Sequence, residues 1–110
     1  MSFDIESPDA TEFSSRQCVE IGRGYVNKVE VALYADLKYN WCQMQEIREG
    51  LESGVDVTKY NDPEYTWGQM GEIRLALENR VYDSDIFTKD IEWHAMGKIR
   101  HQLEDKINGK

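Results

Sequence analysis

Positive charge is scarce in this 110-residue chain: 13 Lys and Arg stand against 21 Asp and Glu, which gives a formal net charge of −8. A protein that binds nucleic acid directly normally presents a basic surface to the phosphates, so this charge argues against that class. It also argues against docking on an anionic membrane. No apolar stretch approaches the ~20 residues that span a bilayer, and the N-terminus lacks the basic and apolar regions of a secretory signal. We therefore expect a cytoplasmic protein.

Cysteine is also scarce, with only Cys18 and Cys42. A secreted domain of this size that depends on disulfides usually carries about four or more cysteines. The sequence therefore predicts free thiols. No Cys-x-x-Cys pair or Cys/His spacing indicates zinc, and a metal site at His94 and His101 needs a further ligand such as Glu104. We expect no metal and no cofactor.

What the chain does contain is an internal repeat with an offset of 26 residues. Three segments align without a gap and share Trp, Met, Ile, Arg, Leu and Glu: Tyr39–Glu52, Tyr65–Glu78 and Ile91–Glu104. A degenerate copy begins at Phe13 and lacks the shared Trp, Met and Arg. Self-similarity at a fixed period indicates tandem structural units that bury their apolar faces on one another.

Each copy is predicted to be a helix. In the second copy Trp41, Met44, Ile47 and Leu51 fall at i, i+3, i+6 and i+10, a spacing that places apolar residues on one helix face. We interpret the repeated Trp as part of the core between units. The alternative is a row of exposed Trp that forms an interaction surface.

The starts of these helices carry capping signals. A Ser, Asn or Thr stands three residues before a Gln, the pattern of a capping box, in which each side chain bonds a free backbone N–H of the first turn. The predicted boxes are Ser14 with Gln17, Asn40 with Gln43, and Thr66 with Gln69. The fourth copy has Glu92 and Ala95 instead, so we expect a weaker start there. Gly54 is a predicted C-cap.

A shorter apolar segment follows each helix. Val31 and Tyr34, and likewise Val57 and Tyr60, are spaced i, i+3, which favours a short helical turn; Asn61-Asp62-Pro63 then turns the chain. The sequence thus predicts an all-α fold of four helix–turn–short-helix units, stacked as a small solenoid or a compact bundle. Residues 1-12 form an acidic leader, and residues 13-110 form one domain with units at about 13-38, 39-64, 65-90 and 91-110.

The run from Tyr60 to Glu78 resembles a short repeat of uncharacterised proteins in gut bacteria, their phages and conjugative elements. That repeat reads approximately Tyr-Ala-Asp-Pro-x-aromatic-x-Trp-x-Gln-Met-x-x-Ile-Arg-x-Gly-Leu-Glu, and the similarity extends over about four units, from Phe13 to Ile107. The resemblance implies a helical repeat module that is often linked to mobile DNA. It carries over no activity and no binding residues.

Two sets of charged residues are candidates for binding a partner. The repeated arginines Arg48, Arg74 and Arg100 each precede a Glu by four residues, which favours an ion pair along the helix; a row of such arginines is also able to bind carboxylates of a partner. The acidic set lies in the segments between the helices and comprises Asp56, Asp62, Glu64, Asp83, Asp85 and Asp90. Because the linkers recur every 26 residues, we expect these acids to line one edge of the stack.

No Ser/His/Asp or Cys/His arrangement and no phosphate-binding loop indicates an enzyme. The sequence favours a non-catalytic protein that binds a protein partner with a basic surface, as an inhibitor or adaptor from a phage or mobile element. Small acidic phage proteins that mimic DNA, including some anti-CRISPR proteins, resemble it in size and charge. The alternative is a structural module that self-associates as a homodimer through Ile99, Leu103 and Ile107.

Overall fold

The protein is all-helical over residues 13–109, which a computed structural model describes; the acidic leader expected at residues 1-12 lies outside them. The four α-helices are α1 (Ser15–Val26), α2 (Trp41–Ser53), α3 (Trp67–Glu78) and α4 (Trp93–Ile107). Two short 3-10 helices, η1 (Val31–Leu33) and η2 (Val57–Lys59), follow α1 and α2. No strand occurs within this range. The prediction of an all-α fold is confirmed.

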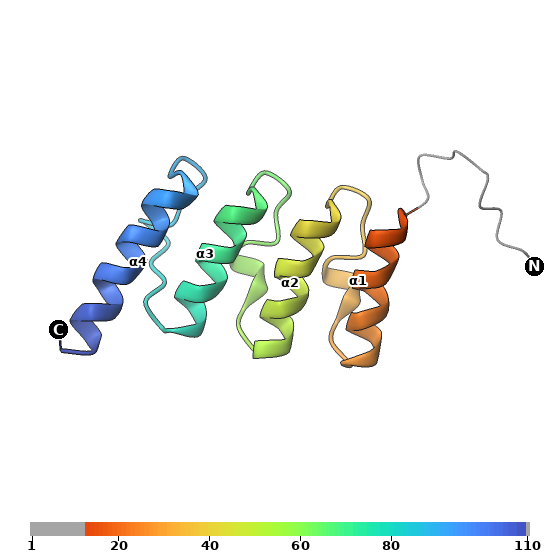
Figure 1. The fold of residues 1–110 in the computed structure, drawn as a ribbon, viewed down its shortest axis with the longest axis horizontal. Helices are drawn as coiled ribbons and strands as arrows, with labels where there is room; N and C mark the ends of the chain where they lie inside the picture. The colour runs from red at the N-terminus through yellow and green to blue at the C-terminus, as the bar shows by residue number, and fades with distance from the viewer. Residues whose placement is uncertain (1–12, 110) are drawn as a thin grey trace, which may run out of the picture.

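The four α-helices lie side by side in one row, in the order of the sequence, and all run in the same direction (Figure 1). Each linker carries the chain from the end of one helix back to the level where the next begins. The main interhelical contacts are α1 with α2, α2 with α3, and α3 with α4. The buried surface is therefore distributed along the row.

The helix starts follow the capping signals. Ser14, Asn40 and Thr66 each accept a hydrogen bond from the backbone N–H of the Gln three residues later, and that Gln accepts one in return. The three predicted capping boxes are confirmed, and they satisfy backbone donors that a helix leaves unpaired. Glu92 makes no side-chain cap at α4, as expected. Gly54 ends α2 in the left-handed conformation, at φ 83°.

The core consists of the repeated Met and Ile together with aromatic residues from the linkers. Met44, Met70 and Met96 are fully buried. The expectation that the repeated Trp belongs to this core is wrong for Trp67 and Trp93, which are 57% and 46% exposed, whereas Trp41 is half-buried. At about 100° per residue, the Met, Ile and Leu of each helix fall within a narrow arc, and the Trp lies about 60–120° away from them. The Trp therefore sits beside the buried face.

A tyrosine from each of the first two linkers inserts beneath its own helix. The hydroxyl of Tyr34 donates to the backbone oxygen of Glu20 at 2.7 Å, and that of Tyr60 to Glu46 at 2.6 Å. A Cβ at Gly50 would lie 2.1 Å from the Tyr60 hydroxyl oxygen, so only glycine fits there, as at the equivalent glycine of α1. The small residue makes room for the tyrosine of its own unit.

The third linker departs from the predicted plan because it contains no short helix. In η2 the amide of Lys59 donates to the backbone oxygen of Asp56. One unit later the equivalent amide, that of Asp85, donates instead to the Asp83 side chain at 2.9 Å. Short acidic side chains compete in this way with helical backbone bonds. The third linker also places Phe87, rather than an equivalent of Tyr60, in the core.

Candidate protein-binding surface and the interhelix clamps

Each interface between successive helices is built around one arginine. Between α1 and α2, the Nε of Arg48 donates to Glu20 at 2.8 Å, and its Nη1 donates to Glu52 at 2.7 Å. The Glu52 carboxylate also accepts from the side chain of Asn27, at the end of α1. The bonds from Arg48 to Glu20 and from Asn27 to Glu52 thus cross the interface, and the bond from Arg48 to Glu52 connects them within α2. We call this four-residue arrangement an interhelix clamp.

The same clamp recurs at the next two interfaces. Between α2 and α3 its distances are 2.9 Å for Arg74 to Glu46 and 2.7 Å for Arg74 to Glu78. Between α3 and α4 both distances, from Arg100 to Glu72 and to Glu104, are 2.8 Å. The fourth members are Ser53 and Asn79. Each clamp holds two carboxylates and one guanidinium, so it keeps a net charge of −1.

The clamps shift the titration of their members. Burial alone would lower the pKa of Arg48, but the hydrogen bonds to its two glutamates outweigh burial and raise that pKa. Burial raises the pKa of Glu46 despite the opposing effect of Arg74. For Glu52, the bonds from Asn27 and Arg48 outweigh burial and lower the pKa. The arginines of the three clamps are therefore protonated at neutral pH.

The positions of Arg48, Arg74 and Arg100 revise the expectation that they face a partner. Arg48 and Arg100 are 7% and 8% exposed, and Arg74 is largely buried. Each hydrogen-bonds two carboxylates, and Arg74 also lies 3.3 Å from Glu49. The predicted pair along the helix is present, but sequence reasoning missed the partner on the preceding helix. A signal for it exists: Glu20, Glu46 and Glu72 occupy equivalent positions, two residues before the position of the repeated arginine.

The two ends of the row lack the clamp residues. At the arginine position α1 has Gly22, beside which a Cβ would meet no atom within 4 Å. At the glutamate position α4 has Lys98, which is exposed. A second copy stacked on either end in the same register would therefore find neither the donor nor the acceptor of a clamp.

The predicted acidic residues lie mostly on the surface. Asp56, Asp83 and Asp85 are exposed in the first half of their linkers, shortly after a helix ends. Glu64 and Asp90 are exposed in the second half, just before the next helix, where Asp62 is half-buried. The acids thus occupy two positions along each linker.

One lysine joins two of the predicted acids. The Nζ of Lys89 lies 2.7 Å from Asp62 and 3.0 Å from Glu64, one linker earlier. These hydrogen bonds raise the pKa of Lys89 and, from the other side, lower that of Asp62. Asp56 bonds within its own linker, to Thr58, which lowers its pKa. The remaining three predicted acids, Asp83, Asp85 and Asp90, make no ion pair within the described range.

The residues expected for self-association are partly in the core. Ile99 and Leu103 pack against it, whereas Ile107 is exposed. At the opposite end α1 exposes Val19 and Val26, two further apolar side chains. These two valines lie on α1, at the other end of the row of helices from Ile107.

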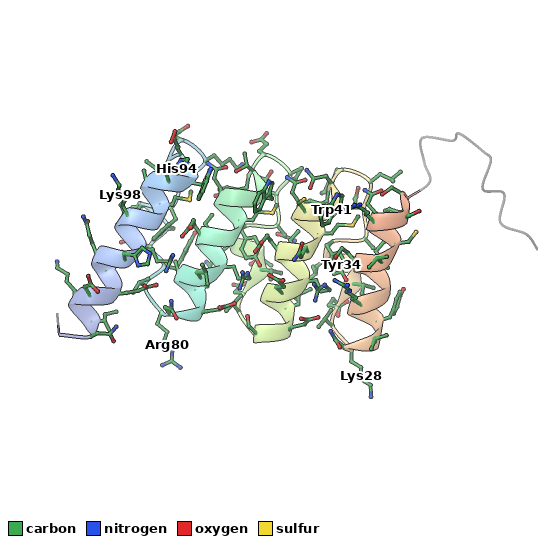
Figure 2. The ribbon with its side chains drawn as sticks, in the orientation of Figure 1. Lys28, Tyr34, Trp41, Arg80, His94 and Lys98 are labelled. Atoms are coloured by element: carbon green, nitrogen blue, oxygen red, sulfur yellow. The ribbon has the colours of Figure 1, made fainter. Side chains whose placement is uncertain are left out.

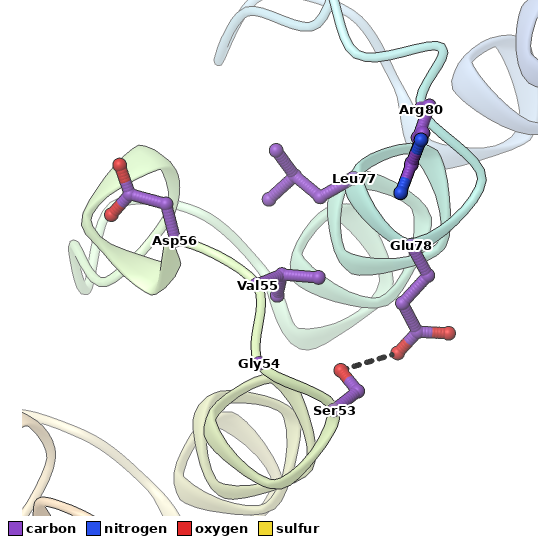
Figure 3. A pocket seen from close by; sticks show the side chains of 7 residues that line it. All are labelled: Ser53, Gly54, Val55, Asp56, Leu77, Glu78 and Arg80. Carbon is purple, nitrogen blue, oxygen red and sulfur yellow. Dashed lines mark hydrogen bonds between the residues drawn. The ribbon is translucent and has the colours of Figure 1, made fainter.

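The hollows of the surface offer little to a small ligand. One separates the ends of α2 and α3 and is lined by Ser53, Asp56 and Glu78 among others (Figure 3). Ser53 and Glu78 bond each other at 3.0 Å, and Asp56 bonds Thr58. Three of its polar side chains, Ser53, Asp56 and Glu78, are thus already hydrogen-bonded. Residues 13–109 hold no cluster of side chains suited to a metal, and Cys18 and Cys42 are free.

Comparison of the chain with family models, with curated proteins and with solved structures gave no match. Within the described part of the chain, no helix has the length and apolar character needed to cross a membrane.

Proposed function

We propose that the chain is a non-catalytic helical-repeat module that binds a protein partner through the acidic surface of its linkers. The supporting observation is the direction of the charges. Arg48, Arg74 and Arg100 pair with glutamates between the helices, so their positive charge is neutralised there and is not presented to a partner. Asp83, Asp85 and Asp90 stay exposed in the linkers and make no ion pair within the described residues. A surface of this kind attracts a basic partner rapidly and in a salt-dependent way.

The proposed architecture is a small solenoid. Its support is the recurrence of equivalent contacts at an offset of 26 residues: each clamp arginine bonds a glutamate 28 residues earlier and another four residues later. Solenoids present extended surfaces to protein partners. The phosphates of a nucleic acid also form an extended negative surface, which the acidic linkers would imitate. We therefore propose that the partner is a nucleic-acid-handling protein whose basic groove is occupied, and so inhibited, by this module.

The test is affinity capture with immobilised protein at about 50 mM and about 500 mM salt, a range over which screening of exposed charges becomes strong. The variant is D83N/D85N/D90N, which removes three exposed linker charges. The control, D105N, removes an exposed acid of α4, outside the linkers. We expect proteins that are retained at low salt, are lost at high salt and are bound at least tenfold less by the linker variant than by the control.

Double-stranded DNA, added as a competitor, tests the nature of the basic surface. If DNA displaces the captured proteins, they use a nucleic-acid-binding surface, as proposed. Equal capture by the linker variant and the control contradicts the acidic-surface function. If neither salt nor DNA releases the captured proteins, the acidic-surface function is contradicted as well.

A further inference from the structure

Three tryptophans mark one edge of the row of helices. Trp41, Trp67 and Trp93 are the first residues of α2, α3 and α4, and the last two are largely exposed. Because the helices run in the same direction, their first residues lie along the same edge, where Figure 2 shows Trp41 at one end and His94 near the other. We call these three residues the tryptophan edge.

The indoles of Trp41 and Trp93 lie against the helix that precedes their own. The guanidinium of Arg16, on α1, lies 4.8 Å from the centre of the Trp41 ring. A Cβ at Gly68, on α3, would lie 2.9 Å from Cγ of Trp93. Each of these indoles therefore leans on the preceding helix. Each also borders a surface hollow. Trp41 lines one of them together with Val19, and Trp93 lines another together with Thr66.

The spacing of this edge matches one type of peptide. Neighbouring packed helices stand about 8–10 Å apart, so the indoles recur at about that interval. A polyproline II helix rises about 3.1 Å per residue and has three residues per turn, or about 9.3 Å per turn. A proline at every third position would therefore meet successive indoles. Flat aromatic side chains are also the surfaces on which proline-rich segments are recognised.

The charge around the edge favours a basic peptide. Glu64 stands three residues before Trp67, and Asp90 and Glu92 stand just before Trp93; all three are exposed. The side chain of Glu64 remains 74% exposed although it contacts Lys89. His94 stacks on the Trp93 ring, with the ring centroids 3.9 Å apart, and Arg16 lies over the Trp41 ring. Trp67, which is 57% exposed, is therefore the indole best placed to attract Lys and Arg side chains.

We propose that the tryptophan edge binds an extended, basic, proline-rich segment with proline at every third residue. This inference rests on the proposed function, since it names the part of a basic partner that the module recognises. The indoles hold the prolines, and the acids before α3 and α4 pair with the basic side chains between them. Recognition then uses a segment that is already extended when free, which lowers the entropic cost of binding.

The test uses three synthetic peptides of twelve residues with equal charge. One repeats Lys-Ala-Pro, the second replaces every Pro by Ala, and the third contains the same residues as the first without the three-residue period. Binding is measured by tryptophan emission and by calorimetry at low salt. We expect the periodic proline peptide to bind at least tenfold more tightly than either of the others.

Variants locate the site. Trp67→Ala and Trp93→Ala remove exposed side chains, so the fold should persist, which circular dichroism checks; each is expected to weaken the proline peptide at least fivefold. Tyr25→Ala is the matched control, because it removes an exposed aromatic residue from the end of α1, away from this edge. Its affinity should equal that of the unmodified protein.

Equal affinity for the proline and alanine peptides overturns the proposal, and so does unchanged affinity in both Trp variants. If both peptides bind equally and release with salt, the acidic surface still functions as proposed and only the tryptophan edge fails. If neither peptide binds while basic proteins are captured through the linker acids, the partner is a folded surface and the inference is again overturned. Failure of both experiments removes the proposed function itself.

Discussion

Single glycines of this protein have opposite roles that depend on their surroundings. Gly50 leaves the space that the Tyr60 hydroxyl fills, whereas Gly22, at the outer face of α1, has open space around it. Both lie within helices, where glycine costs about 0.5–1 kcal/mol relative to alanine. The cost is compensated by a tyrosine at one site and by no contact at the other.

Gly50→Ala should therefore destabilise the protein by about 2 kcal/mol, because the new Cβ meets the Tyr60 hydroxyl and core overpacking typically costs about 1–3 kcal/mol. Gly22→Ala is the control and should stabilise by about 0.5–1 kcal/mol. Urea unfolding followed by circular dichroism measures both. The two effects should differ in sign; a stabilising Gly50→Ala contradicts the explanation.

The tyrosine can be tested in the same series. Tyr60→Phe removes the hydroxyl and should cost about 1 kcal/mol through the lost bond to Glu46. In that background Gly50→Ala should cost at least about 1 kcal/mol less than it does alone, since contacting residues are not additive. Simple additivity means that the glycine serves some other purpose.

Acid should weaken the clamps. The pKa values of Glu52 and Glu104 are lower in the folded protein than the ordinary value of 4.5. Their stabilising contribution is therefore complete above the unfolded pKa and is lost as the pH falls through the folded values. The raised pKa of Glu46 acts in the opposite direction, because its protonation favours the folded state. Below about pH 4.3 we expect the stabilisation from Glu52 and Glu104 to be lost, while protonation of Glu46 opposes that loss.

Urea midpoints measured between pH 7 and pH 3 test this balance. The urea midpoint of the unmodified protein should fall as the pH falls. The midpoint of Glu52→Gln should fall less steeply, and its free energy of unfolding at pH 7 should be about 1 kcal/mol lower. Asp105→Asn, which removes an exposed acid next to a clamp residue, is the control. A Glu52→Gln curve parallel to that of the unmodified protein would falsify the assignment.

The helix ends show how far local signals determine an element. A residue just after each α-helix has a left-handed backbone in all four units: Lys28 at φ 60°, Gly54 at φ 83°, Arg80 at φ 62° and Gly109 at φ 77°. Glycine adopts this conformation without the penalty of about 1–2 kcal/mol that other residues bear. The first and third units therefore retain some strain.

Lys28→Gly and Arg80→Gly should each stabilise the protein by about 0.5–1 kcal/mol, and Gly54→Ala should destabilise it by about 1 kcal/mol. Thermal unfolding measures all three. The exposed Lys59→Gly, at a residue with no left-handed backbone, is the control and should destabilise. A loss of stability in both left-handed positions would contradict the role assigned to the backbone.

The helix starts were predictable from sequence, but part of the linkers was not. Ser14, Asn40 and Thr66 act within three residues of themselves, so their pattern is visible locally. In the third linker Asp83, Ser84 and Asp85 stand where the second linker has Val57, Thr58 and Lys59. There the Asp85 amide donates to the Asp83 side chain, and the short helix is absent. The sequence displays the change, but its outcome depends on which bond forms in the folded chain.

The tryptophan and arginine assignments needed the whole molecule. Periodicity placed Trp41 on the same broad face as Met44, but only packing shows which part of that face is covered. The pair of Arg48 with Glu52 was readable from their spacing, whereas its pair with Glu20 spans 28 residues and depends on how units stack. The exposed acids were predictable because charged residues in turns usually remain on the surface.

The row of helices should not unfold uniformly. α2 and α3 are packed on both sides, whereas α1 and α4 each have one neighbouring helix. Local opening follows the number of stabilising contacts. Native-state hydrogen exchange should show the slowest amides in α2 and α3 and faster exchange in α4, whose Ile107 is exposed. Equal protection in all four helices would mean that the row opens only as one cooperative body.

The clamp has a consequence for the evolution of length. A unit duplicated between α2 and α3 would carry both clamp residues. Its arginine would bond the glutamate of the preceding helix, and its glutamate would bond the arginine of the following helix, so every interface would keep its clamp. A unit added outside α1 meets Gly22 in place of the arginine, and one added outside α4 meets Lys98 in place of the glutamate. Variation in copy number should therefore arise from the interior of the gene, with both terminal units retained.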